Sequence, residues 1–207
     1  MPTIEKLRAM FPALETSPDI FLDNAGGSQV PGSVADAIRG YMLSRYVQLG
    51  ADYATSRAAT QVVDEAHRFV ELLFNAGDGG RAILGPSTSV LCIMLADCYA
   101  RRGPGERDEI VIAETAHEAN AGPWARLAER GFTVRVWPMD GETTELRLDD
   151  LAALLSDRTA IVAFPHVSNI LGRIEDASAI TRLAHEHGAR VVVDGVAYAP
   201  HRAMDVR

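Results

Sequence analysis

The sequence contains very little lysine and cysteine. Of its 20 lysine and arginine residues only Lys6 is a lysine, and its two cysteines are Cys92 and Cys98. The cysteines are six positions apart in one stretch of helical period, so their side chains point to different faces and cannot form a local disulfide. We expect both to be buried, reduced thiols. Lys6 is therefore the only residue in this sequence that could serve a mechanism requiring a lysine.

Long apolar runs and an excess of positive charge are also absent. The longest apolar run, at 90–96, is far too short to cross a bilayer, and the N-terminal residues lack the apolar stretch of a signal peptide. The formal net charge is -8 and the pI is about 5.2. Nucleic acids and anionic membranes attract clustered cations, so neither is expected as a partner. We expect a cytoplasmic protein with a small-molecule partner.

The glycine-rich fingerprints of nucleotide sites are missing as well. The stretches at 77–80 and 101–108 lack the GxGxxG spacing, and no Walker-type Gly-Lys pair is present. We interpret both stretches as surface connections, and an unrelated nucleotide-binding α/β fold ranks last among the interpretations. His185 and His187 are two positions apart near a predicted helix end and do not share a face, so no metal site is expected.

The sequence does contain the pattern of an α/β protein. Its 207 residues, 47% of them hydrophobic, can form a sizeable core. Short β-branched runs alternate with segments of helical period, which predicts a mostly parallel sheet sandwiched by helices. The predicted strands are 20–23, 82–84, 109–113, 133–137, 160–164 and 190–194. The predicted helices are 31–47, 59–74, 88–101, 117–130, 149–155 and 177–187, with Gly131 and Gly188 as left-handed ends for two of them.

Polar clusters follow four of the predicted strands, at the sheet edge where ligands bind in open parallel sheets. The first cluster contains Ser87, Thr88 and Ser89 at the start of a predicted helix. Free N–H groups and the helix dipole favour an anion such as phosphate at that position. Serine and threonine are also ordinary N-caps, so this cluster alone leaves both roles open.

Three further side chains at this edge have possible chemical roles. Asp194 ends a run of three valines, and its carboxylate could pair with a protonated ring nitrogen, form a turn or bind a metal. His117, at a strand-to-helix turn, could stack on a ring, transfer a proton or cap the helix. Asn169 could donate to a phenolate oxygen or be an ordinary loop residue. Each residue alone leaves these alternatives open.

Taken in order, five motifs resemble the landmarks of class V aminotransferases. They are FLDNAGGSQVP, a Ser/Thr turn after a strand, TAHEANAGPW, HVSNILGRIED and VVVDGVAYAPHRAMDV. The similarity is to the cysteine desulfurase-like group and covers nearly the whole chain. It implies pyridoxal 5'-phosphate as cofactor and the incomplete large domain of a fold type I enzyme over 20–207. Residues 1–19 would then pack with the small domain.

The resemblance also implies a partner and a role for each candidate residue. The substrate is an amino acid, with cysteine as a candidate, and the full-length parent is a homodimer. By position, Ser87 and Thr88 would hold the phosphate, with Ser89 as a weaker candidate. His117 would stack on the pyridine ring as the catalytic candidate, and Asp194 would pair with the ring nitrogen. Asn169 would approach the ring oxygen or the substrate, and Asn24 and Ala25 would border the substrate pocket.

Two departures from the family pattern limit what this chain can do. Ala197 stands where relatives place a glutamine or histidine near the ring oxygen. The lysine that forms a Schiff base with the cofactor in relatives would follow beyond Arg207, and Lys6 is not a credible replacement for it. We therefore expect this chain to be the N-terminal portion of a longer enzyme that removes sulfur from an amino acid or carries out related lyase chemistry. By itself, the chain is expected to be inactive and prone to association. The alternative is a non-catalytic relative that binds a phosphate ligand or a protein.

Overall fold

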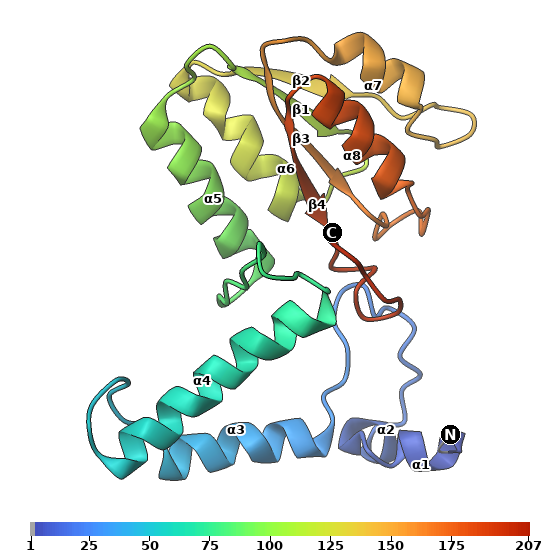
Figure 1. Ribbon diagram of the computed structural model, residues 1–207. Helices are drawn as coiled ribbons and strands as arrows, with labels where there is room; N and C mark the ends of the chain where they lie inside the picture. The colour runs from blue at the N-terminus through green and yellow to red at the C-terminus, as the bar shows by residue number, and fades with distance from the viewer. Residues whose placement is uncertain (1–2) are drawn as a thin grey trace. The chain divides into compact units, whose positions relative to one another are not determined.

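The computed structural model describes residues 3–207, which form two compact units (Figure 1). The first unit contains the described residues up to Ile83 together with Met204–Arg207, and the second unit contains Leu84–Ala203. None of the helices within residues 3–207 is long and apolar enough to cross a membrane.

The first unit is helical and buries few of its own side chains. Its only buried residues among those described are Ser56 and Ala59. The final residues of the chain lie beside the end of the longest helix, where the Val206 amide donates to the Phe74 carbonyl at 3.2 Å. Its helices are α1 (Ile4–Arg8), α2 (Pro12–Thr16), α3 (Gly32–Ser44) and α4 (Ala54–Leu73).

The second unit is an α/β layer built on four parallel strands. The strand order is β2-β1-β3-β4, and every neighbouring pair is parallel. This confirms the predicted fold class. The elements are α5 (Thr88–Arg102), β1 (Glu109–Ala113), α6 (Glu118–Ala125), the 3-10 helix η1 (Arg126–Arg130), β2 (Thr133–Trp137), α7 (Leu148–Leu154), β3 (Thr159–Pro165), α8 (Ala177–Glu186) and β4 (Arg190–Asp194).

Alternating residues of the central strands enter two separate cores. In β1, Val111 packs with Trp137 and Ile180 on the face covered by α7 and α8. The neighbouring residue Ile110 packs with Trp124 on the face covered by α5 and α6. Successive strand side chains point to opposite faces, so a strand that is buried on both sides reads as one continuous apolar run. Figure 1 shows these two helix layers on either side of the sheet.

Several predicted boundaries need correction. The segments 20–23 and 82–84 are not strands, because no strand among the described residues pairs with them and their apolar side chains remain largely exposed. The predicted helix 117–130 changes to a 3-10 turn after Ala125. Neither cysteine is fully buried as predicted, because Cys92 is half-buried and Cys98 is exposed. The two predicted left-handed glycines are confirmed, with φ of 88° at Gly131 and 70° at Gly188.

Candidate functional site

The carboxyl edge of the sheet brings Asp194 next to the turn that follows β3. Asp194 is the last residue of β4 and pairs in register with Pro165. The His166 amide donates to the Asp194 carbonyl at 2.8 Å, and the Asp194 carboxylate accepts the Val196 amide at 3.0 Å. The side chain is half-buried. Asp194 therefore presents a carboxylate at the rim of an apolar sheet, as the run of valines predicted.

The N-terminus of α5 has the local features that favour an anion. Ser87 is its N-cap and accepts the Val90 amide at 3.3 Å, and the first turn contains no acidic residue. The positive end of the helix dipole is therefore not neutralised locally. A Cβ at Gly85 would lie 2.6 Å from the Leu91 side chain, so glycine permits the loop to approach the helix. Thr88 and Ser89 are the first two residues of the helix.

His117 caps the N-terminus of α6 by its side chain. Its Nδ1 accepts the Ala119 amide at 3.0 Å, so the neutral ring carries its proton on Nε2. The ring is exposed at the carboxyl end of β1. A capping role and a stacking role are therefore compatible, because capping uses only the edge of the ring.

Asn169 lies in a tight turn after β3. The turn is closed by the Gly172 amide, which donates to the Ser168 carbonyl at 2.8 Å, and by an antiparallel bridge between Val167 and Ile174. Buried Ser168 also accepts the Leu171 amide through its hydroxyl. Asn169 itself is exposed at this turn, so the fold supports a loop position open to a ligand.

Contacts of Cys92 place α5 beside α6 and near the end of β4. Its thiol donates to the Asn120 side-chain oxygen of α6 at 4.0 Å. Burial raises the pKa of the Cys92 thiol, and the negative charge of Asp194 raises it further. The start of α5 therefore lies near both α6 and Asp194, so Ser87, His117 and Asp194 belong to one edge.

The structure also reveals a pair that sequence reasoning missed. The rings of His166 and Tyr198 stack with centroids 3.6 Å apart and an interplanar angle of 9°. Burial lowers the pKa of His166, and its Nδ1 is buried without a hydrogen-bond partner among the described residues, as is the Thr115 hydroxyl. The two rings are 32 positions apart along the chain, so no local pattern could have predicted the stack.

A family model described as aminotransferase class-V matches residues 20–207. The chain belongs to the aminotransferase class-V family. This confirms the resemblance found in the five motifs, and similarity to cysteine desulfurases supports the narrower group.

The class-V chain is similar to curated proteins over nearly all of its length. It is 42% identical to the aminotransferase-like protein FGM3 of Gibberella zeae, over 99% of this chain and 52% of that protein. It is 36% identical to a cysteine desulfurase of Dickeya dadantii, over 99% of this chain and 51% of that protein. The chain thus spans about half the length of the relatives it matches.

Solved cysteine desulfurases share the fold of this class-V chain. The enzyme CsdA of Escherichia coli matches with a TM-score of 0.79 and 28% identity, covering all of this chain and 52% of that one. An apo cysteine desulfurase of Thermococcus onnurineus matches with a TM-score of 0.85 and 25% identity, covering all of this chain and 50% of that one. None of these matches supports the non-catalytic alternative.

The candidate site of this class-V aminotransferase chain has the chemical groups that a phosphorylated pyridine would need. The positive helix N-terminus suits a phosphate, and the half-buried carboxylate of Asp194 suits a protonated ring nitrogen. Two buried polar atoms, on Thr115 and His166, have no hydrogen-bond partner within residues 3–207. Asn24 and Ala25 lie in an exposed turn of the first unit, and their role at the substrate pocket stays a prediction.

Proposed function

We propose that this chain is the cofactor-binding portion of a pyridoxal-phosphate-dependent enzyme that removes sulfur from an amino acid, with cysteine as the substrate. The observation that carries the proposal is the position of Asp194 at the end of β4, on the same edge as the N-terminus of α5. The similarity to cysteine desulfurases supports the choice of reaction.

The candidate residues contact different parts of the bound cofactor. Bound pyridoxal phosphate supplies a ring that accepts electron density from the substrate's α-carbon. Asp194 holds the proton on the ring nitrogen, because a nearby anion raises the pKa of that nitrogen. Ser87, Thr88 and Ser89 donate to the phosphate, which lies at the positive end of α5.

The remaining residues orient the ring and the substrate. His117 covers one face of the ring while its Nδ1 stays bonded to the Ala119 amide, so the ring cannot turn freely. Asn169 donates its amide N–H to the ring oxygen or the substrate. We further propose that Asn24 and Ala25 border the substrate pocket and that residues 1–19 pack against the small domain.

We propose that the full-length enzyme is a homodimer in the cytoplasm. The dimer is supported by the large apolar side chains that the first unit leaves exposed, among them Ile38, Tyr46 and Leu72. Apolar surface of this kind is stabilised when another protein surface covers it.

The test is performed on the natural protein that carries this chain. Pyridoxal phosphate binding is followed by absorption, and turnover by release of alanine from cysteine. We expect Asp194→Ala to lower kcat by on the order of 100-fold, since it removes one electrostatic contact to the reacting system. We expect Ser87→Ala to weaken cofactor binding about tenfold, through loss of a hydrogen bond to a charged group.

The matched control is Asp157→Ala, which removes an exposed carboxylate from the loop before β3. It should leave both readouts unchanged. Failure of the natural protein to bind pyridoxal phosphate would reject the cofactor assignment. Cofactor binding without alanine release would keep the cofactor and reject the reaction.

A further inference from the structure

A cleft of about 340 Å³ lies at the amino edge of the sheet in the second unit. Its walls come from the end of α5, the loop before β1, and the first residues of β3 and β4. Because all four strands are parallel, this edge is opposite the one that carries Asp194. A five-residue strand is roughly 17 Å long, so the cleft is separate from the candidate cofactor site.

The charge of this cleft is positive although the chain as a whole is acidic. Arg102, Arg107 and Arg190 line it, and Glu106 is the only carboxylate among the described residues of its lining. Within residues 3–207, neither Arg102 nor Arg190 forms an ion pair. Their guanidinium groups therefore remain available to an external anion.

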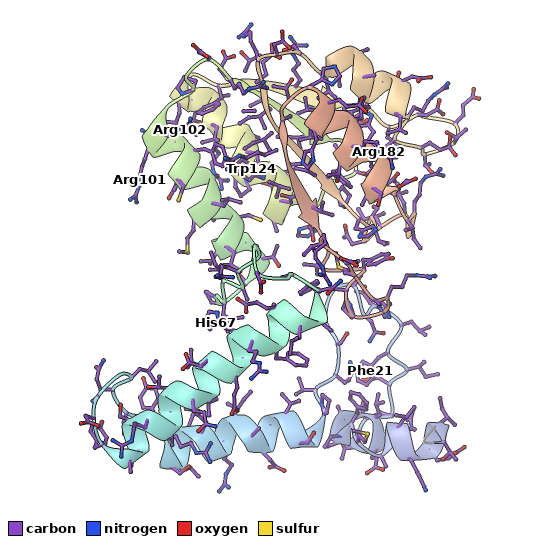
Figure 2. All side chains as sticks on the ribbon, in the orientation of Figure 1. Phe21, His67, Arg101, Arg102, Trp124 and Arg182 are labelled. Carbon is purple, nitrogen blue, oxygen red and sulfur yellow. The ribbon has the colours of Figure 1, made fainter. Side chains whose placement is uncertain are left out.

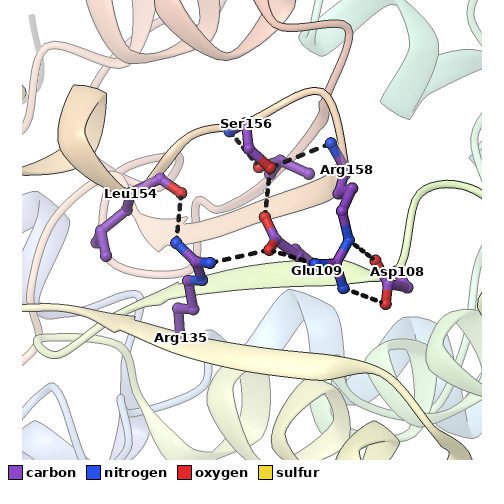
Figure 3. Close-up of polar contacts among 7 residues, drawn as sticks. Asp108, Glu109, Arg135, Leu154, Ser156 and Arg158 are labelled. Atoms are coloured by element: carbon purple, nitrogen blue, oxygen red, sulfur yellow. Dashed lines mark hydrogen bonds and ion pairs between the residues drawn. The ribbon is translucent and has the colours of Figure 1, made fainter.

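Other arginines near this edge are already neutralised (Figure 3). Arg158 forms a two-point contact with Asp108, at 2.8 and 2.6 Å. Arg135 donates to buried Glu109 at 2.9 Å. The acidic residues next to the cleft are thus occupied elsewhere, which leaves the three lining arginines with an excess of positive charge.

Arg107 is held in position before any ligand binds. Its Nη1 donates to the Thr159 carbonyl at 2.9 Å and the His187 carbonyl at 2.8 Å. A Cβ at Gly188 would lie only 2.5 Å from its Nη2, and the φ of Gly188 is 70°. Glycine at this position therefore leaves room for the guanidinium, and a preorganised side chain loses little entropy when a ligand arrives.

We propose that this cleft binds a small organic anion, a carboxylate or phosphate attached to a flat apolar body. The arginine forks match the oxygens of such groups, and half-buried Tyr99 supplies aromatic surface in the same cleft. The cleft volume is at the lower end of the range for small-molecule pockets, so the ligand is small. The proposal does not depend on the function assigned to the opposite edge.

The cleft is tested by titration calorimetry with benzoate, phenyl phosphate and inorganic phosphate. The natural protein is first loaded with one equivalent of pyridoxal phosphate and freed of excess by gel filtration, so that the probes do not report the other edge and free cofactor does not fill the cleft. The titrations are repeated without pyridoxal phosphate, so failure of the cofactor proposal leaves this test readable. Tighter binding of benzoate identifies a carboxylate ligand, tighter binding of phenyl phosphate identifies a phosphate ligand, and inorganic phosphate isolates the contribution of the apolar body.

Two neighbouring residues provide a matched pair of variants. Arg101 and Arg102 lie at the same end of α5 (Figure 2), and both suit the negative end of its dipole, but only Arg102 lines the cleft. We expect Arg102→Ala to weaken probe binding about tenfold and Arg101→Ala by less than about twofold. Glu106→Gln removes the opposing carboxylate and should tighten binding.

Three results would overturn the proposal. The first is that none of the three probes binds. The second is an equal loss in Arg101→Ala and Arg102→Ala, which would show general surface attraction. The third is weaker binding in Glu106→Gln, and this variant keeps the proposal testable even if Arg102→Ala does not fold.

Discussion

At the scale of single residues, the environment of Glu175 predicts that the stability of the protein depends on pH. Its side chain is buried, and burial raises its pKa despite the opposing charge of Arg173. A carboxyl whose folded pKa lies above its unfolded value stabilises the fold at low pH, and this contribution is lost as the pH rises through the folded pKa. Glu175→Gln should therefore be more stable than the natural protein above that pKa and show no such gain near pH 4.

This prediction is checked by urea unfolding of both proteins from pH 4 to pH 8. Glu142→Gln is the control, because Glu142 is exposed in a nearby loop. A Gln variant that is less stable than the natural protein at pH 8 would contradict the sign of the effect.

Glu109 is a second buried carboxylate, and here its partners stabilise the charge. It accepts Arg135 at 2.9 Å and the Ser156 hydroxyl at 2.5 Å, with Arg158 3.6 Å away. Loss of one partner from a buried ion pair costs about 3–5 kcal/mol. We expect Glu109→Ala to lower the free energy of unfolding by about 3 kcal/mol, the low end, since both arginines remain partly exposed.

Thermal or urea unfolding measures the loss at Glu109. The control is Glu129→Ala in η1, an exposed change that should stay within about 0.5 kcal/mol. Equal stability of Glu109→Ala and Glu129→Ala would show that the network in Figure 3 adds no net stability.

At the scale of elements, α8 depends on a side-chain cap. Asp176 accepts the Ala179 amide at 3.0 Å, and Ile180 and Ala184 bury the inner face of the helix. Loss of such a cap costs about 1 kcal/mol. Asp176→Ala should lower the unfolding free energy by that amount, whereas Ser178→Ala in the first turn should change it little. An unchanged stability in Asp176→Ala would mean that packing alone holds the helix end.

Pairing between strands explains why four of the predicted strands are present and two are not. The four strands of the second unit were predicted because each is a short β-branched run between helical segments. The segments 20–23 and 82–84 contain similar residues but have no pairing strand in the part of the chain that the structure describes. A strand exists only when another strand accepts its hydrogen bonds, and local composition does not report that partner.

At the scale of the whole molecule, the first unit has little core of its own. Leu22 is 88% exposed, and Leu43 and Leu72 are 71% and 70% exposed. Apolar surface of this extent favours association. We expect the 207-residue chain, expressed alone, to form large species in size-exclusion chromatography with light scattering, and Leu43→Glu with Leu72→Glu to reduce them. A clean monomer of the unchanged chain would contradict this expectation.

The sequence by itself determined the family and the α/β class, and it also supplied the candidate site residues, whose roles stay predictions. These follow from local patterns, because a β-branched run, a Ser/Thr turn before a helix and an ordered set of motifs are all readable along the chain. Asp194 was predicted at the sheet rim for this reason, and β4 does end on it.

Only the tertiary structure decided which distant groups meet. The stack of His166 on Tyr198, the approach of Cys92 to Asn120 and the arginine-lined cleft each join segments that are separate in sequence. The stretch at 101–108 was interpreted as a surface connection, yet Arg102, Arg107 and the glycines between them line that cleft. Such contacts depend on strand order and helix packing, which are set by burial over the whole unit and not by any local run of residues.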